Sequence, residues 1–206
     1  MNPAEIYPAI YADPAHPTYG SGLERYREIL QPIRAGSTFW RSALDLGCGR
    51  GDFVRECHRL GVNAVGWDPW VAFPDDELGW RFINTLPAPP IPFDLVTCVD
   101  VLEHCLDEGA AMRLIDLAFA HARFRASFAI SDMSDIHRVP GHGDVELHTL
   151  RRDLPWWLNL IQTCAISTGF ATPQAHRINS DRFLIWADAD ALTCAGVDMM
   201  PLAATP

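Results

Sequence analysis

The chain has 206 residues, of which 49% are hydrophobic and 20% are charged. This composition is typical of a folded globular protein and excludes a disordered or fibrous chain. The formal net charge is −10 and all 16 basic residues are arginines, so unspecific binding to the phosphates of a nucleic acid is not expected.

No run of about 18 apolar residues occurs, so a membrane span is not expected. The N-terminus lacks the basic and apolar regions of a signal peptide. Six cysteines are scattered without a CxxC pair and are expected to be reduced thiols of a cytoplasmic protein. The length predicts a single domain over 1–188, with 1–21 as an N-terminal arm or lid and 189–206 as a flexible tail.

Hydrophobic periodicity and turn residues predict strands that alternate with helices. In chain order the predicted elements are a helix over 22–35, a strand over 42–46, a helix over 52–60, strands over 63–67, 80–86 and 93–99, a helix over 107–121, a strand over 124–131, a polar loop over 132–149, a helix over 153–169, and strands over 173–179 and 182–187. The short strand–helix–strand unit over 42–67 is interpreted as a βαβ crossover, which makes its two strands parallel.

The most informative segment is the glycine-rich turn between the first strand and the next helix, Gly47-Cys48-Gly49-Arg50-Gly51. Glycines at alternate positions let the backbone turn sharply and approach a ligand closely. The helix that follows points its N-terminal N–H groups into the same crevice. The acidic Asp52 at the start of this helix would repel a pyrophosphate, so the segment favours a ligand without phosphates over a dinucleotide.

A further acidic residue, Asp68, closes the next strand, 19 residues after Gly49. A carboxylate in this place can accept hydrogen bonds from both hydroxyls of a ribose. The ligand is therefore expected to carry a ribose, to lack phosphates, and to tolerate the nearby carboxylates of Asp45 and Asp52. S-adenosylmethionine, with its ammonium and sulfonium groups, has these properties.

Three stretches, LDLGCGRGDF (44–53), AVGWDPW (64–70) and PFDLVTCVDVLEHC (92–105), resemble in order and spacing the first, second and fourth motifs of the class I S-adenosylmethionine-dependent methyltransferases. The order of strands and helices is similar to that family over 22–187. The resemblance implies an α/β fold of the Rossmann-like, doubly wound type, with a mostly parallel seven-stranded sheet whose last strand is antiparallel. It also implies S-adenosylmethionine as the cofactor.

The resemblance implies a role for each matching residue. The aspartate and the glycines of the first motif would line the methionine end of the cofactor, and the aspartate of the second motif would hold the ribose. Pro69 and Trp70 would flank the adenine, while Asn84 and Thr85 stand where the family often has an acidic residue. The full set of expected cofactor-binding residues is Asp45, Gly47, Gly49, Gly51, Asp68, Pro69, Asn84, Thr85, Asp100 and Tyr19.

Transfer of a methyl group from a sulfonium depends mainly on positioning, and a base is needed only when the acceptor atom is protonated. The candidate catalytic bases are His104, just after the strand over 93–99, and His148, before the helix over 153–169. For His104 the alternative is a structural role in fixing a turn. The histidine spacing matches no zinc signature, so no metal site is predicted.

The expected function is transfer of a methyl group to a small or medium-sized acceptor, with an oxygen of a sugar, lipid or secondary metabolite as the first choice. The NPPY and DPPY motifs of amino-directed DNA methyltransferases are absent after the fourth strand, where VDVLEH stands. Two alternatives come from other classes: a NAD(P)-dependent Rossmann oxidoreductase, and a non-catalytic cofactor-binding or partner subunit of the same fold. The sequence leaves the oligomeric state open.

Overall fold

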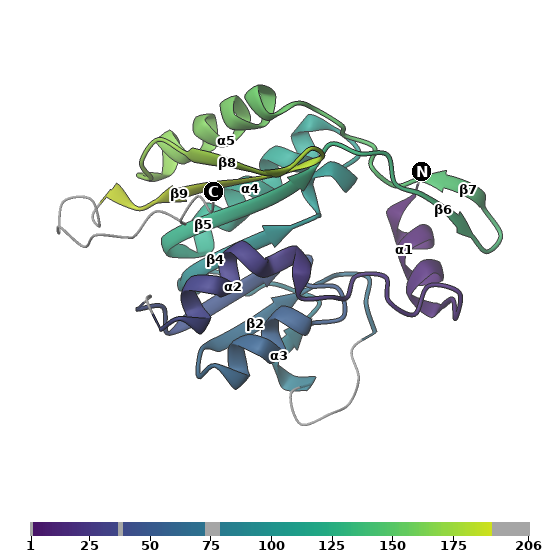
Figure 1. Ribbon diagram of the computed structural model, residues 1–206, viewed down its shortest axis with the longest axis horizontal. Helices are drawn as coiled ribbons and strands as arrows, with labels where there is room; N and C mark the ends of the chain where they lie inside the picture. Colours follow the sequence, from purple (N-terminus) through teal and green to yellow (C-terminus); the bar gives the residue numbers. More distant parts are fainter. Residues whose placement is uncertain (1, 37–38, 73–78, 191–206) are drawn as a thin grey trace.

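The computed structural model describes residues 2–36, 39–72 and 79–190. Its centre is a seven-stranded sheet with the strand order β3-β2-β1-β4-β5-β9-β8 (Figure 1). β9 runs antiparallel to both of its neighbours, β5 and β8, and the other strand pairs are parallel, which confirms the predicted Rossmann-like sheet. The strands are β1 Ser42–Leu46, β2 Asn63–Trp67, β3 Phe82–Ile83, β4 Phe93–Val99, β5 Ala122–Ser131, β8 Gln174–Asn179 and β9 Arg182–Asp188.

Helices cover both faces of this sheet because its central strands are apolar on both sides. In β4, Val96 and Cys98 pack in one core cluster together with α4 and α5, while Leu95 and Val99 pack in a second cluster together with α2 and α3. This alternation follows from the twofold repeat of side chains along a strand. The helices are α2 Arg27–Arg34, α3 Asp52–Arg59, α4 Glu108–His121 and α5 Leu154–Thr168.

Local signals set the ends of the two long helices. Asp107 caps α4 by accepting a hydrogen bond from the Ala110 N–H at 2.7 Å, and Asp153 caps α5 through the Trp156 N–H at 3.1 Å. Gly169 ends α5 with a φ of 79°, a conformation that suits glycine. The predicted bounds of both helices are therefore close to those observed.

The sequence predicts no helix or strand in the N-terminal arm or in the polar loop over 132–149, but the structure forms regular elements in both. Residues Pro3–Ala12 form helix α1, and the loop contains a hairpin of β6 Ile136–Val139 and β7 Gly143–Glu146. We call α1 together with this hairpin the cover. Figure 1 shows the two parts of the cover side by side at one end of the molecule.

The cover has a small core of its own, which explains why its parts are ordered. Ile6 and Ile10 of α1 pack against Val139 and Leu147, and all four side chains are buried. Neither segment carries enough apolar residues to predict this structure alone, because each supplies only half of the cluster.

The predicted strand over 80–86 is too long. The chain forms a 3₁₀ turn at Gly79–Arg81 and pairs with β2 only through Phe82 and Ile83. The side chain of Asn84 then donates to the carbonyl of Asp68 at 2.6 Å, which draws the chain away from the ladder. The predicted flexible tail lies mostly outside the described residues, although Ala189 still pairs with Phe170.

The sequence predicts that the chain has no membrane span and that its cysteines are reduced. Among the described helices none is long and apolar enough to cross a membrane. Five of the six cysteines lie in the described part of the chain, and all five are free.

We predict that Phe128→Ala lowers the free energy of unfolding by about 3–5 kcal/mol, because this fully buried ring in β5 leaves a cavity between the sheet and α4. Ile166→Ala is the control, since Ile166 on α5 is 67% exposed, and it should change stability by no more than about 0.5 kcal/mol. Urea unfolding followed by circular dichroism measures both. Equal midpoints for the two variants would contradict the assignment of the core.

Candidate active site

The glycine-rich turn leaves the carboxyl end of β1 and enters α3. The N–H groups of Gly47 and Cys48 donate to the Trp67 carbonyl at 2.7 and 3.1 Å, which fastens the turn to the end of β2. Gly49 has a φ of 54°, and a Cβ at this position would lie 2.3 Å from the carbonyl oxygen of Gly20. The turn therefore requires glycine here because the chain after α1 crosses directly over it.

Asp52 does not cap α3, because the capping position is Gly51. Its carboxylate accepts a hydrogen bond from the Gly22 N–H at 2.6 Å. Arg50 donates through its N–H to the Gly20 carbonyl at 3.0 Å. These contacts fix the segment after α1 against the glycine turn.

Asp68 stands at the end of β2 and is 5% exposed. Its carboxylate accepts hydrogen bonds from the N–H groups of Gly49 at 3.1 Å and Trp70 at 2.9 Å. Burial raises the pKa of Asp68, while hydrogen bonds from the backbone N–H groups of Trp70, Gly49 and Val71 act in the opposite direction. The side chain is thereby held in one orientation at the edge of the sheet.

A cavity of about 890 Å³ lies at the carboxyl edge of the parallel strands. Gly47, Asp68 and Asp100, which follow β1, β2 and β4, line one side of it. Tyr7 and Tyr11 of the cover line another side. A ligand site of ~300–1,000 Å³ is usual for one drug-sized molecule, so this cavity is at the large end of that range.

One wall of the cavity carries charges of both signs. Arg182 places its Nη2 atom 3.0 Å from Oδ1 of Asp100, and the Nε atom of Arg25 lies 3.9 Å from the other carboxylate oxygen. Asp100 has a φ of 54°, an unfavourable backbone conformation outside glycine. Two cations beside one carboxylate leave a net positive wall that suits a zwitterionic or anionic group.

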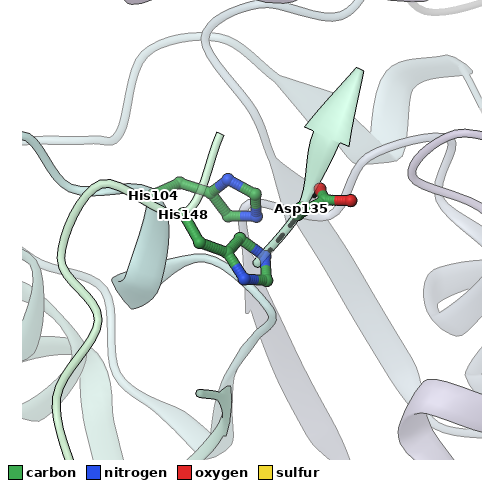
Figure 2. A group of neighbouring side chains, drawn as sticks. All are labelled: His104, Asp135 and His148. Atoms are coloured by element: carbon green, nitrogen blue, oxygen red, sulfur yellow. Dashed lines mark ion pairs between the residues drawn. The ribbon is translucent and has the colours of Figure 1, made fainter. Parts of the chain in front are cut away.

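At another part of the cavity, His104, Asp135 and His148 meet (Figure 2). One ligand atom of each lies within 4.8 Å of the others, and Nε2 of His148 is 3.8 Å from Oδ2 of Asp135. The two imidazole rings are 4.6 Å apart, edge to face. Burial, and next the proximity of His148, lowers the pKa of His104 to about 3, so this ring is neutral near pH 7.

The structure brings seven of the predicted residues to this one cavity. They are Tyr19, Gly47, Asp68, Pro69, Asp100, His104 and His148. Trp70, which was expected beside the adenine, also lines it.

Five predicted residues do not line the cavity. Asp45 is fully buried and accepts hydrogen bonds from the hydroxyls of Tyr26 at 2.9 Å and Thr97 at 2.7 Å. Burial raises the pKa of Asp45 to about 6. Asn84 and Thr85 are exposed, and Asn84 braces the loop after β2. The remaining two, Gly49 and Gly51, lie behind the cavity wall, against Gly20 and Phe82.

Sequence reasoning missed four charged residues of the cavity, Arg25, Arg113, Asp135 and Arg182. Arg25 and Arg182 lie 157 positions apart and meet only because β9 inserts beside β5. For Asp135 a local signal exists, because this residue stands two positions before His137 in the polar loop over 132–149, which contains several histidines.

The comparisons with known proteins agree with this geometry. The family model described as "Methyltransferase domain" matches residues 21–163, so the chain belongs to the methyltransferase domain family. The match confirms the predicted family and class of enzyme, and it disfavours the nicotinamide-dependent alternative. A search of the curated proteins finds no match to this chain.

Solved structures of methyltransferases share the fold. The 1,6-didemethyltoxoflavin-N1-methyltransferase of Burkholderia thailandensis, solved with S-adenosylhomocysteine, is 17% identical, with a TM-score of 0.58 over 80% of this chain and 78% of that one. Magnesium protoporphyrin IX methyltransferase of Synechocystis PCC 6803, solved with S-adenosylmethionine, is 15% identical, with a TM-score of 0.56 over 88% of both chains. An O-methyltransferase family protein of Burkholderia thailandensis is 17% identical, with a TM-score of 0.55 over 87% of this chain and 61% of that one.

Glu103, next to the cavity, is fully buried and accepts a hydrogen bond from the Ser131 N–H at 2.8 Å. Burial, and next the charge of Asp100, raises the pKa of Glu103 well above its ordinary value of 4.5. The folded state therefore keeps this proton to higher pH than the unfolded state does. Stability must fall as the pH rises from about 4.5 toward the raised pKa.

We predict that Glu103→Gln reduces this loss of stability, because glutamine cannot ionise and can still accept the Ser131 N–H. The variant should gain at least about 1 kcal/mol relative to the parent between pH 5 and pH 8. Urea unfolding across this pH range measures the difference. Glu24→Gln, at a side chain that is 89% exposed, is the control and should leave the pH dependence unchanged. A parallel pH dependence of parent and Glu103→Gln would refute the raised pKa.

Proposed function

We propose that this methyltransferase moves the methyl group of S-adenosylmethionine to an oxygen atom of a small or medium-sized acceptor, such as a sugar, a lipid or a secondary metabolite. The observation that carries the proposal is that a single cavity joins the glycine turn and Asp68 to the cluster of His104, Asp135 and His148. The first part suits a nucleoside, and the second suits a hydroxyl group.

The nucleoside end follows from Asp68 and its surroundings. The backbone N–H groups of Gly49, Trp70 and Val71 act on the Asp68 carboxylate, whose two oxygens have about four acceptor sites, so acceptor capacity remains for a ribose hydroxyl. Trp67, Pro69 and Trp70 line the neighbouring wall and offer apolar surface to the adenine.

The methionine end of the cofactor is assigned to the charged wall. The carboxylate group of the methionine part pairs with the guanidinium groups of Arg25 and Arg182. The ammonium group of the methionine part lies toward Asp100 and the turn at Gly47. Tyr19 of the segment after α1 closes this side against water. This assignment gives Asp45 a supporting role, since its hydrogen bonds to Tyr26 and Thr97 hold the end of β1.

The chemical step breaks the bond between the sulfonium and the methyl carbon and forms a bond between that carbon and the acceptor oxygen. The electron pair of the broken bond stays on sulfur, which yields S-adenosylhomocysteine, and the hydroxyl proton of the acceptor is released. Positioning of the two reactants supplies most of the acceleration. His104 and His148 face the cavity where the hydroxyl must lie, and they orient it and assist the loss of its proton.

The cavity volume agrees with a small or medium-sized acceptor, because 890 Å³ must hold both the cofactor and the acceptor. Ala110, Leu114 and Leu117 of α4 supply an apolar wall for the carbon skeleton of the acceptor.

We predict that Asp68→Ala weakens the binding of S-adenosylmethionine by about 5- to 150-fold, equivalent to ~1–3 kcal/mol for the lost hydrogen bonds to ribose. Isothermal titration calorimetry measures the affinity. Asp144→Ala is the matched control, because this exposed aspartate on the β6–β7 hairpin lies away from the cavity. An unchanged affinity in Asp68→Ala would remove the ribose assignment.

We predict that His148→Gln lowers kcat at least tenfold while the affinity for S-adenosylmethionine stays within about twofold, since His148 lies at the acceptor end. The assay follows S-adenosylhomocysteine formation with a panel of hydroxyl and amine acceptors. His142→Gln, an exposed histidine on the same hairpin, is the control and should keep the parental rate. Turnover restricted to amine acceptors would contradict the oxygen acceptor.

A further inference from the structure

The cluster of His104, Asp135 and His148 is assembled from three separate segments. His104 belongs to the 3₁₀ turn Leu102–His104 after β4, Asp135 precedes β6, and His148 follows β7. Convergence of two imidazoles and one carboxylate on one point of a cavity is the arrangement by which many enzymes hold a divalent ion.

The orientation of both histidine rings is fixed from behind. Nδ1 of His104 lies 3.1 Å from the Leu147 carbonyl oxygen, and Nδ1 of His148 lies 2.7 Å from the Met133 carbonyl oxygen. A carbonyl oxygen only accepts, so each Nδ1 carries the hydrogen and donates it. In the neutral rings both Nε2 atoms then keep their lone pairs available, which is the orientation that backbone carbonyls impose on histidine ligands of metals.

The Asp135 carboxylate is also held by a neighbouring side chain. Oδ1 of Asp135 lies 2.8 Å from Nε2 of His137, while Oδ2 lies 3.8 Å from Nε2 of His148. Figure 2 shows the carboxylate beside the two rings, with its ion pair to His148 dashed. His137 is in turn held between the rings of His16 and Tyr19, at centroid distances of 5.0 and 5.2 Å.

We propose that His104, Asp135 and His148 bind one divalent first-row transition-metal ion, with open coordination positions toward the cavity. Two nitrogens and one oxygen suit such an ion better than Mg²⁺ or Ca²⁺, which prefer oxygen ligands throughout. An ion at about 2.1 Å from each ligand holds these atoms ~3–3.5 Å apart. The ligand atoms lie within 4.8 Å of one another in the structure, and Nε2 of His148 is 3.8 Å from Oδ2 of Asp135, so binding of the ion draws them closer together.

The consequence for the reaction rests on the proposed function. A hydroxyl oxygen of the acceptor that coordinates the ion loses its proton to water more readily, because the cation stabilises the oxyanion. The deprotonated oxygen then takes the methyl group as described above. With the ion bound, His104 and His148 act as its ligands and no longer assist the loss of the proton directly, so the proton passes to water. The acceptor class is thereby narrowed to molecules whose reactive oxygen can coordinate a divalent cation.

The direct test is a titration of the chelator-treated full chain, without a histidine tag, with Co²⁺ as the probe. We expect one Co²⁺ per chain, visible d–d absorption, and a Kd in the micromolar range or tighter. His104→Gln, Asp135→Asn and His148→Gln should each weaken Co²⁺ binding at least tenfold, and His142→Gln should not. Circular dichroism and urea midpoints verify that each variant is folded.

Absence of stoichiometric Co²⁺ binding, or binding that folded variants of all three residues retain, would overturn the proposal and leave the three side chains as a hydrogen-bonded cluster. Calorimetry with S-adenosylmethionine, before and after addition of Co²⁺, separates this result from the proposed function. Cofactor binding by the metal-free chain without any Co²⁺ binding would refute only the metal site. Co²⁺ binding by a chain that does not bind S-adenosylmethionine would refute only the assigned cofactor end.

Discussion

Two of the hydrogen bonds that the Asp68 carboxylate accepts fix the loops at the carboxyl ends of β1 and β2 against each other. One comes from Gly49 in the turn after β1 and the other from Trp70 in the loop after β2. Because the same carboxylate joins both loops, their relative position depends on a single side chain. The carboxylate that we propose for ribose binding and the backbone that surrounds it are therefore held in place together, which requires no induced movement of the carboxylate.

The second half of the cavity depends on the cover. The small core of Ile6, Ile10, Val139 and Leu147 docks α1 on the β6–β7 hairpin. The same packing places the tyrosines of the N-terminal segment over the cavity. The cover thus forms one side of the site, and the residues on either side of its hairpin, Asp135 and His148, meet His104.

Several ionisable groups near the site are buried or half-buried, and each has different partners. Asp45 has hydroxyl donors on both oxygens, whereas Asp100 has two arginines. Glu103 has one backbone donor and a raised pKa. Burying a charged group costs free energy unless the group is paired. These groups therefore serve to position the site and do not add to the stability of the fold.

The sequence by itself determined the sheet, the βαβ unit and the position of Asp68 beside the glycine turn. Their signals are local: apolar strands, a glycine turn, and Asp68 at the end of the next strand. The helix α1 and the β6–β7 hairpin were not predictable in this way, because each is stabilised by the other and neither has a complete apolar pattern. The meeting of Arg25 with Arg182, and of His104 with Asp135 and His148, was decided only by the tertiary structure. These residues belong to segments that are far apart in the chain, and no local spacing records a contact made by folding.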